Sequence, residues 1–408
     1  SKNNPIQRDQ LEMVALDQLV PQDHLVRKME AALDFSFIYE LVKDVYSEVG
    51  RPSIDPVILI KLTFIQYTFG IRSMRQTIAE VETNMAYRWF LGYGFHDKVP
   101  HFSTFGKNYE RRFKDTDLFE QIFYRILKTA AEKKLISAEH VFIDSTHVKA
   151  SANKHKFEKK VVRKETRAYQ EKLQVEINQN REDHGKKPFP PDKFDKEESK
   201  EIKESTTDPE SGYYVKDERT KQFAYSFHAA SDRNGFVLGT IVTPGNTHDS
   251  LILEPLVEQV IEKVGKPKAV AADAAYKTPA ITKFLLENEM TPALPYTRPR
   301  TKDGFFRKYE YVYDEFYDCY LCPAGEILRY STTTKEGYRE YKSPKHICAT
   351  CPFLAQCTES KDHQKVVTRH VWQEYVEEAD HLRHKSEVRD IYAKRKETIE
   401  RVFADAKE

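Results

Sequence analysis

Apolar residues recur at helical spacing through the first third of the chain. In DHLVRKMEAALDFSFIYELVKDVY they return every three or four positions, the period of an amphipathic helix. VILIKLTFIQYTFG is apolar on most faces and ends at Gly70, which predicts a central core helix. Asp55, Ser73 and Ser103 stand where helices are predicted to begin, and short polar side chains there act as N-caps. Residues 1–135 are therefore predicted to form an all-α domain, compatible with a helix-turn-helix unit.

From residue 140 the pattern changes to short apolar runs typical of strands. HVFIDSTHVKA, QFAYSFHAASD and GFVLGTIVTPG read as strands, and Arg233-Asn234-Gly235 between the last two predicts a hairpin turn. THDSLILEPLVEQVIEKVG and TPAITKFLLENEM are predicted helices, KAVAADAAY a strand that ends at Asp273, and TPALPY a short strand. This order predicts an α/β core with a mixed sheet.

Three further segments are less regular. Residues 153–204 are dense in both acids and bases, which indicates a partly helical insertion or a disordered loop that serves as a spacer or interaction arm. Residues 298–318 are predicted to be irregular, and one last helix is predicted from about 376 to 408. The chain begins without Met and stops inside that helix, so we expect a fragment or trimmed chain that lacks structure at its C-terminal end.

Composition limits the classes of protein that fit. A chain of 408 residues is long enough for two or three domains. No run approaches 18 uninterrupted apolar residues, which excludes a membrane span, and the N-terminus lacks a signal-peptide pattern, so we expect a cytoplasmic protein. With 65 Lys and Arg against 64 Asp and Glu, the net charge gives no evidence about nucleic acid, and only local clusters can.

Two acids follow short apolar runs that read as buried strands. Asp144 and Asp273 therefore emerge at a sheet edge, where α/β folds place ligands; alternatively, each one caps a turn. Glu400 lies in the last predicted helix on one face with Tyr392 and Lys396, a pattern that equally fits a surface salt-bridge ladder. Convergent carboxylates need a cation between them, and Mg²⁺ or Mn²⁺ takes oxygen ligands. Such a triad points to a metal-dependent nuclease or strand-transfer enzyme.

The five cysteines all lie between residues 319 and 357. They form two C-x-x-C pairs and one further thiol, a spacing typical of tetrahedral structural zinc. Cys322, Cys348 and Cys351 are the expected ligands, and the fourth is either Cys319 or Cys357. The alternative is a set of reduced structural thiols.

Basic residues gather in two places that suit DNA phosphate. One cluster lies on a predicted helix and the other in a loop that also contains Phe305, Phe306 and Tyr309. Solvated surfaces look similar, so each cluster fits either role. The clusters are Lys107, Arg111, Arg112 and Lys114, and then Arg298, Arg300, Lys302, Arg307 and Lys308. His147 and Lys149, which follow Asp144, fit a phosphate contact or an ordinary surface equally well.

Four segments together resemble the DDE insertion-sequence transposases. They are IDSTHVKA, PGNTHDS, AADAAYKT and the final helix with its Tyr, Arg, Glu and Lys. The resemblance implies an RNase H-like catalytic core, with Asp144, Asp273 and Glu400 as the catalytic acids that bind two Mg²⁺ or Mn²⁺ ions. The family's final helix also has basic residues that hold DNA, matched here by Arg395 or Lys396 and by Lys407. The interval between Tyr392 and Glu400 departs from the family pattern, which leaves open whether Arg395 or Lys396 is that base.

The resemblance also implies the activity and the domain plan. We expect a transposase that cleaves double-stranded DNA at its element's ends and transfers the freed 3′-hydroxyl to target DNA, as a homodimer at the nucleoid. A decayed or repurposed transposase that only binds DNA is the alternative. The expected domains are an all-α DNA-binding domain over residues 1–135 and a core over 140–318 that carries the charged insertion. A small zinc-ribbon-like insertion over 319–357 and the end of the core over 358–408 follow.

Overall fold

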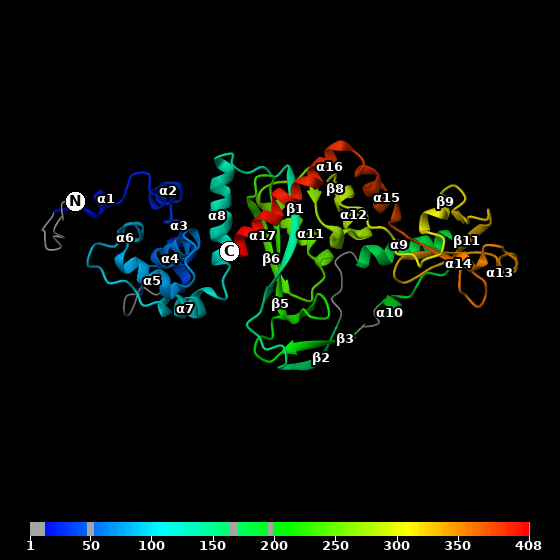
Figure 1. The fold of residues 1–408 in the computed structure, drawn as a ribbon, viewed down its shortest axis with the longest axis horizontal. Coiled ribbons are helices and arrows are strands. Elements are labelled where there is room, and N and C mark those ends of the chain that lie inside the picture. The colour runs from blue at the N-terminus through cyan, green and yellow to red at the C-terminus, as the bar shows by residue number, and fades with distance from the viewer. Residues whose placement is uncertain (1–12, 47–52, 164–169, 195–198, 408) are drawn as a thin grey trace, which may run out of the picture. The chain divides into compact units, whose positions relative to one another are not determined.

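The chain divides after Leu135 into two compact units (Figure 1). The computed structural model describes residues 13–46, 53–163, 170–194 and 199–407. In these parts of the chain, no helix has both the length and the apolar character needed to cross a membrane.

The first unit is helical in all its described regular elements, as predicted. A 3₁₀ turn, Lys43–Val45, and a π-helical turn, Tyr109–Phe113, complete it. Its helices are α1 Leu16–Leu19, α2 Leu25–Ala32, α3 Phe37–Leu41, α4 Pro56–Thr68, α5 Met74–Thr83, α6 Met85–Leu91, α7 Ser103–Asn108 and α8 Leu118–Glu132.

Two of the three predicted N-caps are confirmed. The Asp55 side chain accepts a hydrogen bond from the backbone N–H of Val57 at the start of α4, and Ser73 caps α5. The prediction for Ser103 is wrong, because Ser103 is the first residue of α7. The ring of His101 contacts both the backbone nitrogen and the hydroxyl of Ser103, so the Ser103 side chain is engaged upstream of the helix.

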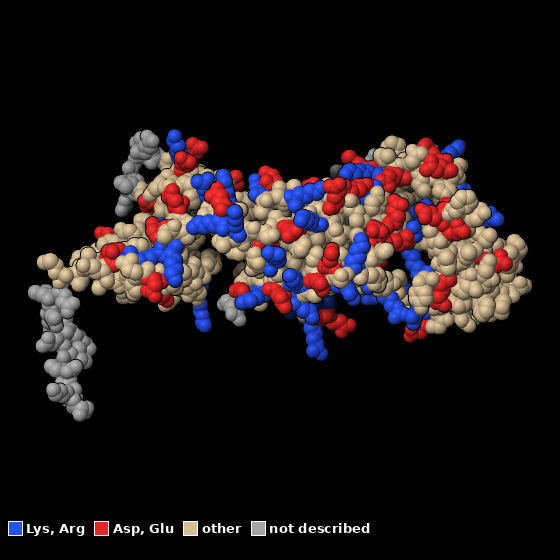
Figure 2. Space-filling view, turned by 90° about the horizontal axis from the view of Figure 1, so that it is seen from above, with Lys and Arg blue, Asp and Glu red and all other residues tan. Residues whose placement is uncertain are grey.

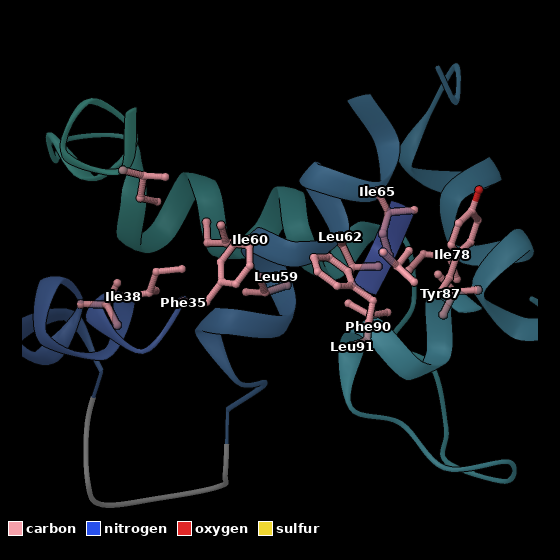
Figure 3. Packing of buried hydrophobic residues seen from close by; sticks show 14 of the residues in the cluster. Phe35, Ile38, Leu59, Ile60, Leu62, Ile65, Ile78, Tyr87, Phe90 and Leu91 are labelled. Atoms are coloured by element: carbon pink, nitrogen blue, oxygen red, sulfur yellow. The ribbon is translucent and has the colours of Figure 1, made fainter. Parts of the chain in front are cut away.

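Helix α4 lies at the centre of the first unit's hydrophobic core (Figure 3). Leu59, Ile60, Leu62 and Ile65 of this helix are almost completely buried. They pack with apolar side chains from α3, α5 and α6, so α4 meets neighbours on several sides. This explains why its sequence is apolar on most faces rather than on one stripe.

The second unit is built on a mixed eight-stranded sheet. The order of the path is β2-β3-β4-β5-β1-β7-β8, and β6 pairs with β5. Strand β5 is antiparallel to β1 and β6, whereas β7 and β8 run parallel to β1. The strands are β1 His140–Lys149, β2 Phe157–Arg163, β3 Ser199–Ser205, β4 Gly212–Val215, β5 Lys221–Ser231, β6 Val237–Pro244, β7 Ala269–Ala271 and β8 Thr291–Ala293.

Most predicted elements of this core are confirmed. The four predicted core strands are present as β1, β5, β6 and β7, the turn at Arg233-Asn234-Gly235 joins β5 to β6, and TPALPY contains β8. The two helices between them are α11 Leu253–Lys263 and α12 Pro279–Glu287. A 3₁₀ turn, Asp249–Leu251, precedes α11 and is capped by His248.

The charged insertion is more ordered than a disordered loop over its described residues. Strands β2 and β3 extend the main sheet, and the insertion also contains helices α9 Gln170–Asp183 and α10 Pro191–Phe194. Helix α9 docks on a second sheet, where the Arg181 guanidinium donates to the carbonyl oxygen of Thr333 at 2.8 Å. His184, just after α9, lies 2.6 Å from the Asp318 carboxylate.

The second sheet contains the cysteine-rich segment. It is antiparallel, with the order β13-β12-β11-β10-β9, and its first strand lies in the segment predicted to be irregular. The strands are β9 Val312–Asp314, β10 Cys319–Leu321, β11 Ile327–Thr333, β12 Tyr338–Lys342 and β13 Val366–His370. Two short helices, α13 Lys345–Cys348 and α14 Leu354–Cys357, lie between β12 and β13.

The prediction of one helix from 376 to 408 is wrong. The segment contains three helices, α15 Gln373–Leu382, α16 Ser386–Ala393 and α17 Ile399–Lys407. A 3₁₀ turn, Lys394–Glu397, follows α16, and Thr398 then leaves the helical region with φ −111° and ψ −96°. Tyr392, Lys396 and Glu400 therefore belong to three different elements and do not form one helix face.

Candidate active site

Two of the predicted acids stand at the same level of adjacent parallel strands. The pairing of β1 with β7 ends at Phe142 opposite Ala271. Asp144 and Asp273 each come two residues beyond that pair, so both emerge where β7 ends. Asp144 remains within β1, because β5 continues to pair with β1 as far as Lys149. The structure thus brings together two acids 129 positions apart in the sequence.

Glu400 reaches the same region through the packing of α17. Ile399 and Phe403 of this helix are buried against Phe142 of β1 and Ala229 of β5. Figure 1 shows α17 running beside these strands. Glu400, next to Ile399, is exposed and close enough for its charge to act on Asp144.

Burial raises the pKa of the Asp144 carboxyl. Arg395 opposes this shift, whereas the neighbouring carboxylates of Asp273 and Glu400 add to it. The guanidinium Nη2 of Arg395 donates to Oδ2 of Asp144 at 3.0 Å, and the Arg395 side chain is only 8% exposed. The Nε of Arg395 is buried and has no hydrogen-bond partner among the described residues. The acids therefore form a cluster of like charge that one guanidinium partly neutralises.

No group of three or more His, Cys, Asp or Glu side chains within the described ranges is arranged to hold a metal ion. This covers the three acids and the cysteines alike. The chemistry of the acids nevertheless suits a hard cation, because carboxylate oxygens are the ligands that Mg²⁺ and Mn²⁺ prefer.

Four of the five cysteines line one pocket beside the second sheet. They are Cys322, Cys348, Cys351 and Cys357, and apolar side chains such as Phe306 and Leu328 form the rest of the wall. Burial raises the pKa of the Cys357 thiol, and the nearby Cys322 and Cys348 act in the same direction. Cys319 is buried on β10 and does not line this pocket.

The basic residues predicted to contact DNA differ in their surroundings. Lys107, Arg111, Arg298, Arg300 and Lys396 are exposed. On the face seen in Figure 2, Lys and Arg are interspersed with Asp and Glu, and they do not gather into one basic stripe. The side chain of Lys407 lies outside the described residues.

Three other predicted basic or phosphate-contacting residues are engaged within the chain. The Arg112 guanidinium lies 4.3 Å from the centre of the Tyr46 ring and donates to Asn108 and Ser53. Lys302 pairs with Glu359. His147 stacks on Tyr214 with ring centres 3.6 Å apart.

Two residues near the acids were not among the predicted site residues. His228 on β5 and Tyr276, three positions after Asp273, are both fully buried. A histidine among the apolar residues FHAA was the available signal for His228. Tyr276 lies in the AADAAYKT motif, which was the available signal for it.

Comparisons with known proteins give two family matches and one structural match. Residues 14–111 match the family model described as "Transposase domain (DUF772)", and residues 321–408 match "Transposase DDE domain". No curated protein matches the chain. One solved structure that matches, "Mos1 transposase paired-end complex with left transposon end", is 13% identical, and the match covers 68% of this chain and 69% of that chain. Its TM-score is 0.19.

The family matches agree with the resemblance of the motifs. They lie in separate parts of the chain, one in the helical unit and the other from β10 to the last helix. On these matches and motifs, the chain is similar to the DDE insertion-sequence transposases over residues 14–111 and 321–408.

Proposed function

We propose that this chain is a DNA transposase that binds the ends of its element and catalyses metal-dependent strand cleavage and 3′-hydroxyl strand transfer. The observation that carries the proposal is that Asp144 and Asp273 stand at the same level of adjacent parallel strands, and the charge of Glu400 on α17 also acts on Asp144. These acids come from β1, from the segment after β7 and from α17. A decayed transposase that only binds DNA is the alternative, and the presence of all three acids argues against it.

The core is proposed to be RNase H-like. The support is the sheet itself: β6, β5 and β1 form an antiparallel meander, and β7 and β8 continue it in the direction of β1. The first of the three acids lies on the central strand, and the second follows the adjacent parallel strand. The first unit is proposed to recognise the element ends, and synapsis of two ends implies a homodimer.

In this proposal Asp144, Asp273 and Glu400 would hold the Mg²⁺ or Mn²⁺ ions. When bound, a pair of such ions activates a water or hydroxyl and stabilises the leaving oxygen of a phosphodiester. Arg395 keeps part of the Asp144 charge neutralised beforehand. Exposed Lys396 is the better candidate for a phosphate contact, because Arg395 is buried against Asp144.

A structural zinc ion is proposed for the cysteine pocket, with Cys322, Cys348, Cys351 and Cys357 as the ligands. The supporting observation is that these four thiols share one pocket wall. The backbone N–H of Glu326 donates to the Cys322 sulfur at 3.3 Å, as second-sphere donors do around zinc-bound thiolates. Such a site would be closed and would stabilise the second sheet, not take part in strand cleavage.

The test is cleavage of duplex DNA that carries the sequences flanking the gene, with Mg²⁺ or Mn²⁺. Terminus-specific nicking is expected from the full-length protein and should fall by at least about 10³-fold in Asp144→Asn or Glu400→Gln, since both remove a metal ligand. Glu397→Gln is the matched control, because Glu397 is an exposed carboxylate in the preceding 3₁₀ turn. The Glu397→Gln variant should cleave DNA as the wild type does.

Binding separates the two candidate functions. Tight binding to the termini without cleavage, in either metal and by every variant, would support the DNA-binding alternative and reject the enzyme. Equal loss in Glu397→Gln and Glu400→Gln would reject the assignment of Glu400.

A further inference from the structure

His228 occupies a buried polar position directly beside the acids. It lies on β5 opposite Ser145, the neighbour of Asp144. Its Nε2 is 3.1 Å from the hydroxyl of Thr243 on β6, and its Nδ1 is 3.4 Å from the hydroxyl of Tyr276. The same Nδ1 is 3.7 Å from a carboxylate oxygen of Asp249. One imidazole ring therefore connects β6 with the two 3₁₀ turns that contain Tyr276 and Asp249.

The loop that carries Asp249 is held firmly against β5. The backbone N–H of Gly245 donates to the carbonyl oxygen of Ala224 at 2.8 Å. A Cβ at position 245 would lie 2.6 Å from that oxygen, so only glycine permits this approach. The close packing fixes the start of the segment that brings Asp249 to His228.

Tyr276 links this group to both acids. It belongs to the 3₁₀ turn Ala274–Tyr276, which the Asp273 side chain caps by accepting from the N–H of Ala275 at 2.9 Å. The Ser145 side chain lies beside the Tyr276 hydroxyl and acts to lower its pKa. Burial raises the pKa of the Tyr276 hydroxyl, and so do the carboxylates of Asp249, Asp144 and Asp273.

The strand pairing does not fix the position of Asp273, so a contact outside the sheet must hold it. The ladder between β1 and β7 ends at Phe142 and Ala271, so Asp273 lies beyond the last paired residue. Tyr276 crosses from the turn after Asp273 to β1 at Ser145. Its hydroxyl also contacts His228, the residue of β5 that pairs with Ser145.

We propose that Tyr276, oriented by His228 and Asp249, is a positioning residue that sets the distance between Asp144 and Asp273. The inference rests on the proposed function, because it assigns the two acids to one cation site. Partners behind metal ligands typically change metal affinity by 10- to 100-fold when they are removed. Tyr276, His228 and Asp249 therefore control how well Asp144 and Asp273 are held in place for the cation.

The experiment measures the affinity of the DNA-free full chain for Mn²⁺ by electron paramagnetic resonance, at a temperature below that of unfolding. Tyr276→Phe removes the hydroxyl and keeps the buried ring, and we expect the Mn²⁺ affinity to fall about 10-fold. Tyr341→Phe is the matched control. Tyr341 is also fully buried, its hydroxyl donates to Asp318 at 2.6 Å, and it lies on β12 of the second sheet. Its Mn²⁺ affinity should be unchanged.

Asp249→Asn is a second, less disruptive variant, because Asp249 is partly exposed at 21%. It should weaken Mn²⁺ binding in the same direction, with an unfolding temperature close to that of the wild type. Unchanged affinity in both Tyr276→Phe and Asp249→Asn would overturn the positioning role. An equal fall in Tyr341→Phe would also overturn it, because the effect would then be a general loss of stability.

Asp144→Asn distinguishes this failure from failure of the proposed function. If Asp144→Asn abolishes Mn²⁺ binding while Tyr276→Phe does not change it, the cation site stands and only the positioning role is wrong. If Asp144→Asn leaves Mn²⁺ binding intact, the acids do not form the site, and both proposals are wrong.

Discussion

Arg395 and Asp144 form an ion pair across 251 positions of sequence, and this pair shapes the electrostatics of the candidate site. A carboxylate buried beside two others is expensive to ionise, and a guanidinium at 3.0 Å lowers that cost. At the residue scale, the surroundings of each acid set its pKa, and the residue type alone does not. The same holds for buried histidines elsewhere in the second unit.

His370 gives the second unit a defined pH dependence. Burial lowers the pKa of His370 from 6.5 to about 4, and the charge of Arg339 acts in the same direction. Between these two values the unfolded chain binds a proton that the folded chain does not, so stability is lost as the pH falls from 6.5 to about 4. The difference corresponds to about 3 kcal/mol at most.

The free energy of unfolding is measured by urea titration at several pH values, with the fluorescence of Trp372 as the signal. The chain has two tryptophans, so a Trp89→Phe background leaves Trp372, which is buried beside His370, as the reporter. His370→Asn retains an acceptor for the N–H of Trp372 and should lose less stability over this range. An identical pH dependence with and without His370 would reject its role.

At the scale of elements, packing decided where local patterns were ambiguous. Thr398 interrupts the last predicted helix, and its hydroxyl donates to the carbonyl oxygen of Lys394. The break lets α17 turn its Ile399 and Phe403 onto the main sheet. Helix α9 likewise gains its position from contacts with the second sheet, which no charge pattern within 153–204 indicates.

At the scale of elements, the cysteine segment is predicted to bind zinc. The purified full chain should contain about one zinc ion per chain by elemental analysis, because four thiols complete a structural site. Cys322→Ser and Cys348→Ser should lose zinc and destabilise the second sheet. Cys319→Ser is the control that should retain zinc, since Cys319 lies outside the pocket wall. Absence of zinc from the wild type, or its loss in Cys319→Ser, would contradict the ligand set.

At the scale of the whole molecule, the acids and the helical core belong to different compact units. A divalent cation should therefore stabilise the second unit alone. At a concentration of about 100 times its Kd, Mn²⁺ should add about 2.7 kcal/mol, which is a rise of roughly 5 °C in the unfolding temperature of a unit of this size.

The two tryptophans allow this to be measured unit by unit. Trp89 lies in α6 of the first unit, and Trp372 precedes α15 in the second. The Mn²⁺-dependent shift should occur in the Trp372 signal of a Trp89→Phe variant and not in the Trp89 signal of Trp372→Phe. Adding Asp144→Asn should remove it. A shift of the Trp89 signal, or one that survives Asp144→Asn, would contradict a cation site in the second unit.

The sequence by itself determined the local helices, strands and turns, and it identified the residues that could act as catalysts or ligands. The caps at Asp55 and Ser73, the hairpin at Asn234 and the strand before Asp273 depend on neighbouring residues, so periodicity and turn chemistry were sufficient. The transposase motifs were recognisable for the same reason. Thiol spacing identified the cysteine segment but left its fourth ligand open.

Only the tertiary structure decided which of these residues meet. The strand register brings Asp144 level with Asp273, and the packing of Ile399 and Phe403 places α17 so that the charge of Glu400 acts on Asp144. The positions of Arg395, His228 and Tyr276 depend on contacts between segments far apart in the chain. Side-chain burial and long-range pairing are set by the whole fold, and no local pattern of residues encodes them.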